Sequence, residues 1–461
     1  MARLRRALES DCHLSTKGHA VTDRLAQLYP QHVATVMARA THALERGRCD
    51  HLIVPSGAEV YRFLDDTHYP FATNPQFKAW LPLTQHPHCW LSFTPGRKPV
   101  LAYMLPADYW HLPPAPPSGW WVEHFDVRVI AEPQAAREHL PRDLSRAAIL
   151  GDANSAIEGV VPNNPAAVIN SLDLARTRKT PYEVECMRRA SLLGARAHRA
   201  AAAAYRDRRS EYEIHLAYIE GSGQTESELP YANIVALNEH CSTLHYQFQD
   251  RTRPREHLSL LIDAGAQVHG YAADITRTYG NTDPLFTQLL EGVSREQHSL
   301  CAHVRPGTDW KALHIDTHRA MARVLKDTGI VRMEPESQLE TGVSSVFFPH
   351  GLGHFIGLQV HDVGGFLADE SGATIAKPDG HPYLRCTRVL EAGNAITVEP
   401  GVYFIDMLLA KLKDGPHAGA IDWEKVAHLK RFGGVRIEDD VVVTDGEPEN
   451  LTRDAFRALA T

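Results

Sequence analysis

Three histidines lie close together in the stretch PHGLGHFIGLQVHDVGG, at His350, His354 and His361. Imidazole nitrogens can bind a metal ion or donate a hydrogen bond to a polarised carbonyl group. A zincin-type zinc site needs His-Glu-x-x-His on a helix, but HGLGH has glycine at the position of the glutamate. The two glycines inside HGLGH also disfavour a helix. We therefore predict a non-helical loop that delivers histidine side chains to a site of another kind.

Two aspartates accompany a predicted hairpin in LSLLIDAGAQVHGYAADITRTYG. The apolar run over residues 258–262 predicts a buried strand that ends at Asp263. Gly265 and Gly270 then bracket a turn into a second strand that carries Asp274. Two acids on paired strands would face each other. The alternative is structural, with Asp263 capping a turn and Asp274 in solvent.

Two further acids follow near the end of the chain. Glu399 ends the β-branched run of NAITVEPGVYF, and in FGGVRIEDDVVVT the alternation puts Val435 and Ile437 on one strand face and Arg436 and Glu438 on the other. Taken alone, Arg436 and Glu438 favour a structural ion pair. Four carboxylates with an imidazole instead suit manganese, cobalt or zinc, and carboxylates can bridge two ions. The combined set indicates a metal-assisted hydrolase.

These side chains require a framework of more than one element type. The stretch VTDRLAQLYPQHVATVMARATHALERG predicts a helix, whereas HLIVPSG, CWLSFTP and PVLAYMLP predict strands, so the first half is α/β. Thr180, Pro181 and Glu183 form a capping-box signature before a long helical run. We place a domain boundary near residue 172, with an α/β domain at 1–172, whose first twenty or so residues are an extension, and a catalytic domain at 173–461.

The composition of the chain excludes several classes of protein. With 461 residues, 43% hydrophobic and 23% charged, it has the balance of a globular protein. A net charge of -8 with the signs interspersed argues against nucleic acid as a partner. No window approaches eighteen apolar residues, and no signal-peptide run follows the N-terminus, so we expect no membrane association. Seven cysteines without a CxxC pair predict reduced thiols and a cytoplasmic protein.

The ordered set LIDAGAQVHGYAADITRTY, PHGLGHFIGLQVHDVGG, TVEPGVYF and GVRIEDD resembles the metal-binding motifs of the Xaa-Pro peptidases of pita-bread fold. FLDDTHYPFATNPQFKAWLP, PADYWH, YANIVALNEHCSTLHY and PYLRCTR extend the resemblance toward the bacterial Xaa-Pro dipeptidases, or prolidases, from about residue 25 onward. It implies an α/β (α+β) protein, with a creatinase/prolidase-like N-terminal domain followed by a pita-bread catalytic domain.

The resemblance implies five metal ligands and two divalent ions per chain. The ligands are Asp263, Asp274, His354, Glu399 and Glu438. Asp274 and Glu438 would bridge the ions, Asp263 would complete one site, and His354 with Glu399 would complete the other. Manganese is the expected metal, with cobalt or zinc as alternatives. A hydroxide held between the ions would attack the carbonyl of the Xaa-Pro bond, and Glu399 would carry a proton to the proline nitrogen.

Further residues match positions of the family around the substrate. His361 would hydrogen-bond the scissile carbonyl or its tetrahedral intermediate, and Arg385 would hold the C-terminal carboxylate of the substrate. His245 and Tyr231 match pocket positions. His350 would line the same pocket, with a packing role as the alternative, and Arg436 would support the ligands. All of these roles are assigned through the resemblance.

The resemblance also implies a homodimer in which two first-half motifs reach the active site of the partner. Asp66 in FLDD would meet the free α-amino group of a dipeptide, and Trp110 in DYWH would form a wall for the Xaa side chain. The structural alternatives are an exposed turn aspartate and a packed core tryptophan. Alternative functions are an organophosphorus acid anhydrolase-type side activity, an aminopeptidase of the same fold that takes longer peptides, and a binding module. The intact ligand set argues against the last.

Overall fold

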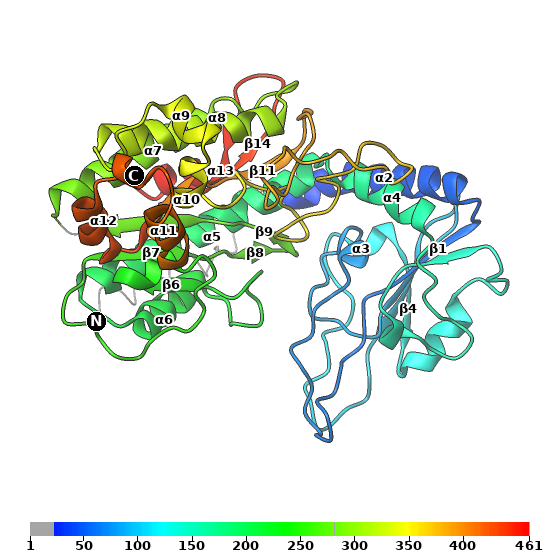
Figure 1. The fold of residues 1–461 in the computed structure, drawn as a ribbon. Helices are drawn as coiled ribbons and strands as arrows, with labels where there is room; N and C mark the ends of the chain where they lie inside the picture. Colours follow the sequence, from blue (N-terminus) through cyan, green and yellow to red (C-terminus); the bar gives the residue numbers. More distant parts are fainter. Residues whose placement is uncertain (1–22, 281, 461) are drawn as a thin grey trace.

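The computed structural model describes residues 23–280 and 282–460, which form two domains (Figure 1). The N-terminal domain, blue to cyan, packs beside the catalytic domain, green to red. One apolar cluster crosses the boundary, because Tyr29 and Val33 of the first domain belong to the same buried cluster as Tyr271 and Ile356 of the second. The expected α/β (α+β) architecture is confirmed.

The N-terminal domain is built on a five-stranded sheet of order β4-β3-β2-β1-β5. Its strands are β1 (His51–Pro55), β2 (Trp90–Phe93), β3 (Val100–Met104), β4 (Asp126–Ile130) and β5 (Ala147–Ile149). The β1–β2 and β2–β3 pairs are antiparallel, and β1–β5 and β3–β4 are parallel. Leu52 and Val54 face the cluster under α2 (Arg24–Gly47), whereas Ile53 faces the opposite cluster, as the two-residue strand period requires.

The predicted elements of the first half are confirmed. Helix α2 covers the stretch expected to be helical, and the three apolar runs form β1, β2 and β3. Two shorter helices complete this half, α3 (Pro75–Lys78) and α4 (Ala166–Arg176). The domain boundary expected near residue 172 falls inside α4, which packs against α2.

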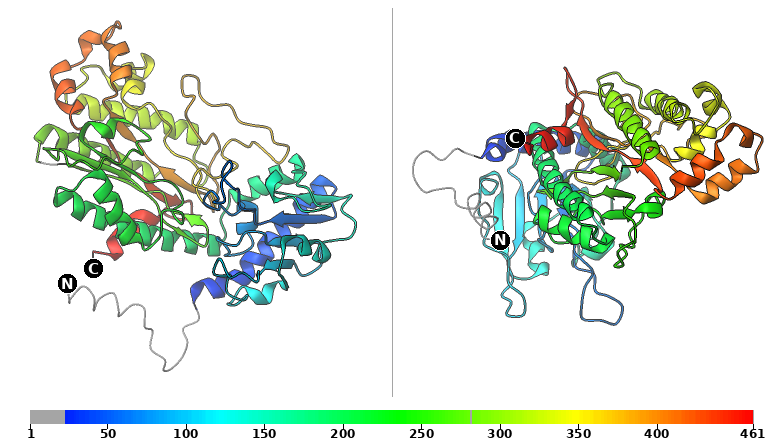
Figure 2. Two further views of the ribbon diagram at one scale, coloured as in Figure 1. Left: turned by 90° about the horizontal axis from the view of Figure 1, so that it is seen from below. Right: turned by 90° about the vertical axis from the view of Figure 1, so that its left-hand side faces the viewer.

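The catalytic domain starts with the helix that the capping signature predicts, α5 (Pro181–Arg206). The Thr180 side chain accepts from the Glu183 amide, and the Glu183 carboxylate accepts from the Thr180 amide. The other helices are α6 (Glu211–Ser222), α7 (Pro284–Cys301), α8 (Trp310–Asp327), α9 (Pro335–Glu340), α10 (Val343–Phe347), α11 (Asp406–Lys413), α12 (Trp423–Lys430) and α13 (Leu451–Ala458). Figure 2 shows these helices on the outer sides of the strands.

Short strands form the centre of the catalytic domain. One sheet has the order β10-β7-β6, with β6 (Ile234–Leu237), β7 (Ser259–Asp263) and β10 (Thr276–Gly280). A second has the order β11-β14-β15, with β11 (Ala395–Val398), β14 (Asp439–Val442) and β15 (Glu449–Asn450). Two pairs complete the set, β8 (Gln267–Val268) with β9 (Tyr271–Ala272), and β12 (Gly401–Tyr403) with β13 (Gly434–Arg436). The Thr276–Glu438 bridge joins these groups.

One sequence expectation needs correction. Asp274 does not lie within the second strand of a simple hairpin, since β10 starts at Thr276 and Asp274 falls between β9 and β10. The physical reason is that its amide donates to Asp440 Oδ2, 3.0 Å away, rather than to a neighbouring strand. At Gly265 an added Cβ would lie 2.1 Å from the Ala273 carbonyl oxygen, so the two segments approach each other closely here.

Further expectations concern cysteines and membranes. Six cysteines are free thiols, and the seventh, Cys12, lies outside the described residues, as does the N-terminal extension. Over residues 23–280 and 282–460, no helix is long and apolar enough to cross a bilayer.

Candidate metal centre and substrate pocket

The histidine loop is delivered to the site by pairing with β11. The Thr397 amide donates to the His354 carbonyl at 2.9 Å, and the Glu399 amide donates to the Leu352 carbonyl at 2.8 Å. Gly353 permits this approach, because a Cβ there would lie 2.0 Å from the Thr397 carbonyl oxygen. The segment is neither helix nor strand, as its glycines predict. Its pairing places His354 beside the carboxylate that ends β11.

The structure brings together all five side chains that the resemblance proposes as ligands. His354 Nε2 lies 3.5 Å from Asp274 Oδ2 and 3.7 Å from Glu399 Oε1. Ligand atoms of Asp274, His354 and Glu438 lie within 4.8 Å of one another. Asp263 is joined to Asp274 by Tyr231, whose hydroxyl lies 2.8 Å from Asp263 Oδ1 and 2.5 Å from Asp274 Oδ1. The result is one compact acidic cluster.

The cluster crowds four carboxyl groups into a site with little solvent, which makes their negative charges costly. Burial, and then the neighbouring carboxylates, raise the pKa of Glu438 well above its ordinary value. Burial also raises the pKa of Glu399 to about 7, against the opposing effect of the His354 and Arg436 charges. Asp274 is held in its charged form, because its hydrogen bond to His354 and that side chain's charge lower its pKa despite burial. The four acids face only two cationic side chains, His354 and Arg436. Divalent ions bound here would neutralise the negative charge that these two side chains leave uncompensated.

Arg436 holds the cluster in place through hydrogen bonds, which agrees with the supporting role that the resemblance implies. Its Nη2 donates to Asp263 Oδ2 at 2.8 Å, Nη1 donates to the Tyr403 hydroxyl at 3.0 Å, and Nε donates to Thr276 Oγ1 at 3.2 Å. The ion pair is therefore made with Asp263, on another strand, and not with Glu438. Thr276 in turn donates to Glu438 Oε2 at 2.7 Å. The network fixes the carboxylates in position.

The cluster opens into a cavity of about 630 Å³. His245, His350, His361 and Arg385 line this cavity together with the five acidic-cluster side chains. The His361 ring lies 4.3 Å from the His354 ring, centroid to centroid. Burial and the His354 charge lower the pKa of His361 to about 4, so the imidazole is neutral at neutral pH. A neutral imidazole here can donate a hydrogen bond to an oxyanion.

The remaining pocket residues have distinct partners. His350 Nε2 lies 2.8 Å from the Tyr403 hydroxyl, so this histidine is tied into the supporting network as well as lining the cavity. Tyr231 does not line this cavity but a neighbouring one of about 720 Å³, which His245 also lines, together with Phe71 and Lys78 of the N-terminal domain. The N-terminal domain thus forms part of the approach to the cluster.

Sequence reasoning missed several supporting residues. Asp362, next to His361, is buried between Arg176 and Lys179, with contacts of 2.6 Å and 2.8 Å. Thr276 and Tyr403 hold Glu438 and Arg436 in place. Asp362 and Tyr403 belong to the motifs PHGLGHFIGLQVHDVGG and TVEPGVYF. Their position beside proposed site residues in these motifs was therefore a signal in the sequence that could have identified them. No pattern in the sequence pointed to Arg176 or Lys179.

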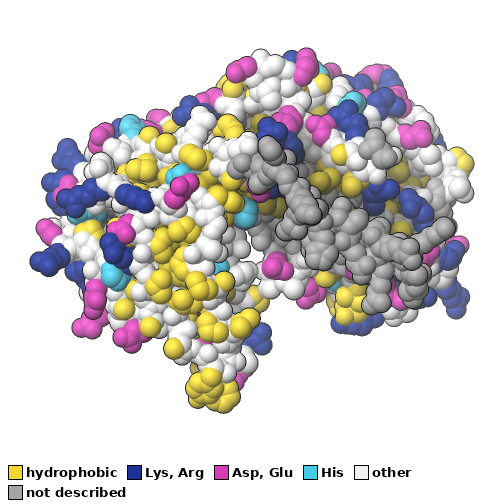
Figure 3. All heavy atoms as spheres, turned by 180° about the vertical axis from the view of Figure 1, so that it is seen from behind, with side chains coloured by type: hydrophobic (Ala, Val, Ile, Leu, Met, Phe, Trp, Pro, Cys, Tyr) yellow, Lys and Arg dark blue, Asp and Glu magenta, His cyan; other side chains and the backbone are white. Residues whose placement is uncertain are grey.

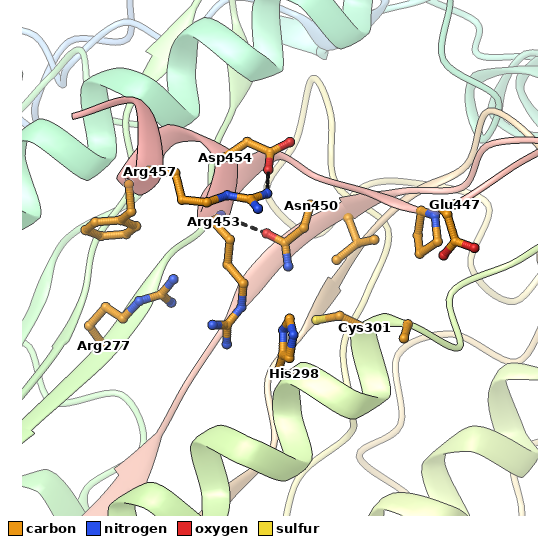
Figure 4. Close-up of a pocket in the computed structure, with 12 residues that line it drawn as sticks. Arg277, His298, Cys301, Glu447, Asn450, Arg453, Asp454 and Arg457 are labelled. Atoms are coloured by element: carbon orange, nitrogen blue, oxygen red, sulfur yellow. Dashed lines mark hydrogen bonds and ion pairs between the residues drawn. The ribbon is translucent and has the colours of Figure 1, made fainter. Parts of the chain in front are cut away.

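A second polar pocket, shown in Figure 4, lies beside β14, the strand that directly follows Glu438. Arg277 and Arg453 line it, and both pair with Asp439, at 2.6 Å and 2.7 Å. Arg277 Nη1 also donates to the Glu438 carbonyl at 2.7 Å. Since these cations are committed to Asp439 and the backbone, the pocket supports the site rather than offering free charge to a ligand.

Asp66 and Trp110 do not line either cavity at the acidic cluster. Asp66 is exposed, and Trp110 is 78% exposed, so the packed-core alternative for Trp110 is wrong. Both lie on irregular segments of the N-terminal domain, and in the right-hand view of Figure 2 two loops project from that domain. Within one chain, these two residues are separate from the site.

Comparisons with known proteins agree with this geometry. Residues 27–174 match the family described as Xaa-Pro dipeptidase, N-terminal domain, and residues 185–445 match metallopeptidase family M24. The chain is 55% identical over 434 residues to a Xaa-Pro dipeptidase of Stenotrophomonas maltophilia, covering 94% of this chain and 98% of the relative. It is 54% identical over 435 residues to a Xaa-Pro dipeptidase of Xanthomonas campestris, covering 94% and 99%.

Solved structures share the fold at lower identity. Aminopeptidase PepP of Pseudomonas aeruginosa is similar with a TM-score of 0.69 and 24% identity, over 93% of this chain and 98% of that chain. A zinc-substituted Escherichia coli aminopeptidase P in complex with product has a TM-score of 0.64 and 24% identity, over 92% and 95%.

Proposed function

Because this chain belongs to metallopeptidase family M24, we propose that its acidic cluster is the metal centre of a Xaa-Pro dipeptidase. The protein is a metal-dependent hydrolase that cleaves dipeptides with C-terminal proline. The observation that carries the proposal is the convergence of four carboxylates and His354 beside a cavity that holds Arg385 and His361. Sites of this kind combine a few converging polar groups with space for a small substrate.

The five side chains of the cluster are proposed to hold two divalent ions. Asp274 and Glu438 are the most buried of the acids, and their ligand atoms lie within 4.8 Å of one another, which supports a bridging role. Asp263 completes one site, and His354 with Glu399 completes the other. Four carboxylates against one imidazole favour manganese over softer ions. When bound, such a pair of ions supplies a hydroxide at neutral pH and polarises the scissile carbonyl.

Proton transfer is assigned to Glu399. Its side chain is 18% exposed, compared with 7% for Asp274, and it lines the cavity. A carboxylate with one oxygen toward the cluster and the cavity beside it can accept a proton and deliver it to the proline nitrogen. That nitrogen leaves as an amine and requires this proton.

His361 and Arg385 are proposed to bind the scissile carbonyl oxygen and the C-terminal carboxylate of the substrate, respectively. His361 donates a hydrogen bond to the oxygen of the tetrahedral intermediate, with His245 on the same cavity wall. Arg385, exposed to the cavity, forms a charge-assisted pair with the substrate carboxylate. Tyr231 and His350 orient the cluster and close the pocket around the substrate.

A homodimer would explain the exposed loops of the N-terminal domain. Large apolar side chains are exposed there, including Phe63 at 90%, Leu64 at 90%, Tyr109 at 87% and Leu112 at 97%. Figure 3 shows yellow side chains gathered on this domain and at its projecting tip. Contiguous apolar surface of this kind marks protein contact sites. In the proposed dimer, Asp66 and Trp110 complete the substrate site of the partner. The free cysteines support a cytoplasmic location.

A hydrolysis panel tests the proposed function. Xaa-Pro dipeptides, Xaa-Pro-Yaa tripeptides and one organophosphate are incubated with metal-stripped protein reconstituted with manganese, cobalt or zinc. We expect turnover of Xaa-Pro dipeptides with manganese, and much weaker turnover of tripeptides. Preferential cleavage of tripeptides would make the protein an aminopeptidase of this fold, and turnover confined to the organophosphate would contradict the dipeptidase assignment.

A further inference from the structure

A second group of potential metal ligands lies outside the acidic cluster. His314 and His318 stand one turn apart on α8, and His381 comes from the irregular segment between Phe355 and Ala395. The ring centroids of the three histidines are 4.6 to 4.8 Å apart. His314 Nε2 lies 3.0 Å from His381 Nδ1. Three imidazoles thus meet at one point, although no sequence motif connects them.

Burial keeps two of these imidazoles neutral. His314 and His318 are each 1% exposed. Burial, and then the charges of the neighbouring histidines, lower the pKa of His314 to about 2 and that of His318 to about 3. The titratable groups that act on His314 are His318, His381 and His350, so no carboxylate contributes. Neutral imidazole is the form that binds metal ions.

Two ring nitrogens in this group lack hydrogen-bond partners among the described residues. They are His314 Nδ1 and His318 Nε2, both buried. Buried polar atoms of folded proteins are seldom left unpaired. The other nitrogen of His318, Nδ1, lies 3.1 Å from Ser344 Oγ, which can accept a hydrogen bond from Nδ1–H. That arrangement leaves a lone pair on Nε2 of a ring that lies 4.8 and 4.6 Å, centroid to centroid, from the rings of His314 and His381. The bond to Ser344 resembles the outer hydrogen bond of metal-binding histidines.

The geometry points to a third metal site, held by His314, His318 and His381 and selective for zinc-class ions; this is our proposal. Zn–N bonds of about 2.0–2.1 Å place ligand nitrogens of a tetrahedron roughly 3.3 Å apart, close to the 3.0 Å that separates His314 and His381. All-nitrogen donors favour zinc, copper or nickel over manganese, in contrast to the acidic cluster. His381 is partly exposed, which leaves one side open for metal entry and a water ligand.

The site would fasten a wall of the substrate pocket to α8. Pro382, Tyr383 and Arg385, which follow His381 directly in the chain, line the cavity at the acidic cluster. Phe348 packs against His318 on one side and His350 on the other, with ring centroids 4.9 Å and 4.8 Å apart. Ion binding would therefore restrict the segment that carries Arg385. This consequence rests on the proposed function, whereas the metal site itself does not.

Metal analysis of matched variants tests the site. Purified protein is loaded with zinc, dialysed, and its zinc content per chain is measured by mass spectrometry. The variants are His381→Phe and His318→Phe, which retain an aromatic ring but lack a ligand nitrogen. His298→Asn is the control, because it removes an exposed histidine from the neighbouring helix α7. We expect wild type and His298→Asn to hold one more zinc per chain than the other two variants.

The readout is a difference in zinc content, so it does not depend on peptidase activity or on how many ions the acidic cluster retains. Equal zinc content in wild type and His381→Phe would overturn the proposal. Because His381 is partly exposed, this variant provides the answer even if His318→Phe fails to fold. A second measurement is hydrogen exchange over residues 376–388. We expect slower exchange with zinc than after chelation in wild type, but no difference in His381→Phe; a zinc effect that persists in the variant would also overturn the proposal.

Discussion

The acidic cluster and the projecting loops of the N-terminal domain differ in what holds their residues in place. Asp274 and Glu438 are 5% and 2% exposed and are held by hydrogen bonds from buried neighbours. Asp66 is exposed, and Trp110 is 78% exposed. One chain therefore suffices to bring the cluster together, whereas in the proposed dimer Asp66 and Trp110 would act at the site of the partner. Burial within one chain is what differs between the two groups of residues.

The largest expected effect is at the cluster. Glu438→Gln keeps the shape of the side chain but removes the charge between the ions. We expect kcat/KM for Xaa-Pro dipeptides to fall by more than about 100-fold, since even outer-shell substitutions at metal sites cause 10- to 100-fold losses. Circular dichroism should stay close to wild type. Turnover near the wild-type value would contradict the assignment of Glu438 as a metal ligand.

An intermediate effect is expected at Arg385, which is exposed yet lines the cavity. Arg385→Ala should weaken binding of Xaa-Pro by about 1.5–3 kcal/mol, the range for a charge-assisted hydrogen bond. Substrates amidated at the C-terminus should lose less, because they lack the carboxylate. The comparison of KM for free-acid and amide substrates checks this, and equal losses would return Arg385 to a structural role.

The loop region is tested by Asp66→Ala. If Asp66 meets the substrate amine of the partner's site, this variant should lose roughly 10-fold in dipeptide hydrolysis, with unchanged metal content. Mixing it with Glu399→Gln should restore activity, because a heterodimer combines one intact Asp66 with one intact metal site. Subunit exchange is verified by light scattering or tagged pull-down. Exchange without recovery of activity would refute the shared site.

The last prediction has no expected effect on activity and concerns the acid stability of the core. Burial lowers the pKa of His198 to about 3 from an ordinary value of 6.5, so the unfolded state binds a proton that the folded state does not. This histidine therefore contributes no destabilisation above pH 6.5 and lowers stability progressively from pH 6.5 to about 3. A plot of unfolding free energy against pH should therefore be less steep for His198→Phe than for wild type, by up to about 1.4 kcal/mol per pH unit in that range. Denaturant titrations check this; an unchanged slope would contradict it.

Local signals in the sequence predicted much of the fold. The Thr180–Glu183 capping box depends on neighbouring residues alone, and it starts α5 where expected. Apolar runs likewise located β1, β2 and β3. The five cluster residues were grouped through the family resemblance that the motifs carry, and local signals contributed the glycines, such as Gly353, that allow the histidine loop its close approach.

Other features depend on contacts between distant segments and could not be read from the sequence. The position of Asp274 outside β10 follows from its bond to Asp440, which belongs to another sheet. The histidine group of α8 forms only because the segment that carries His381 folds back onto that helix. The partners of Asp362 could not be predicted for the same reason, since Arg176 and Lys179 come from a different part of the chain.

The central claim is that the acidic cluster holds two divalent ions, and equilibrium dialysis against manganese tests it most directly. Manganese is the suitable probe because the all-imidazole group should bind it weakly. We predict about two manganese ions per wild-type chain and at most one in Glu438→Gln, with both proteins folded. Wild-type protein that binds no manganese, or a Glu438→Gln variant that retains the full wild-type content, would contradict the account.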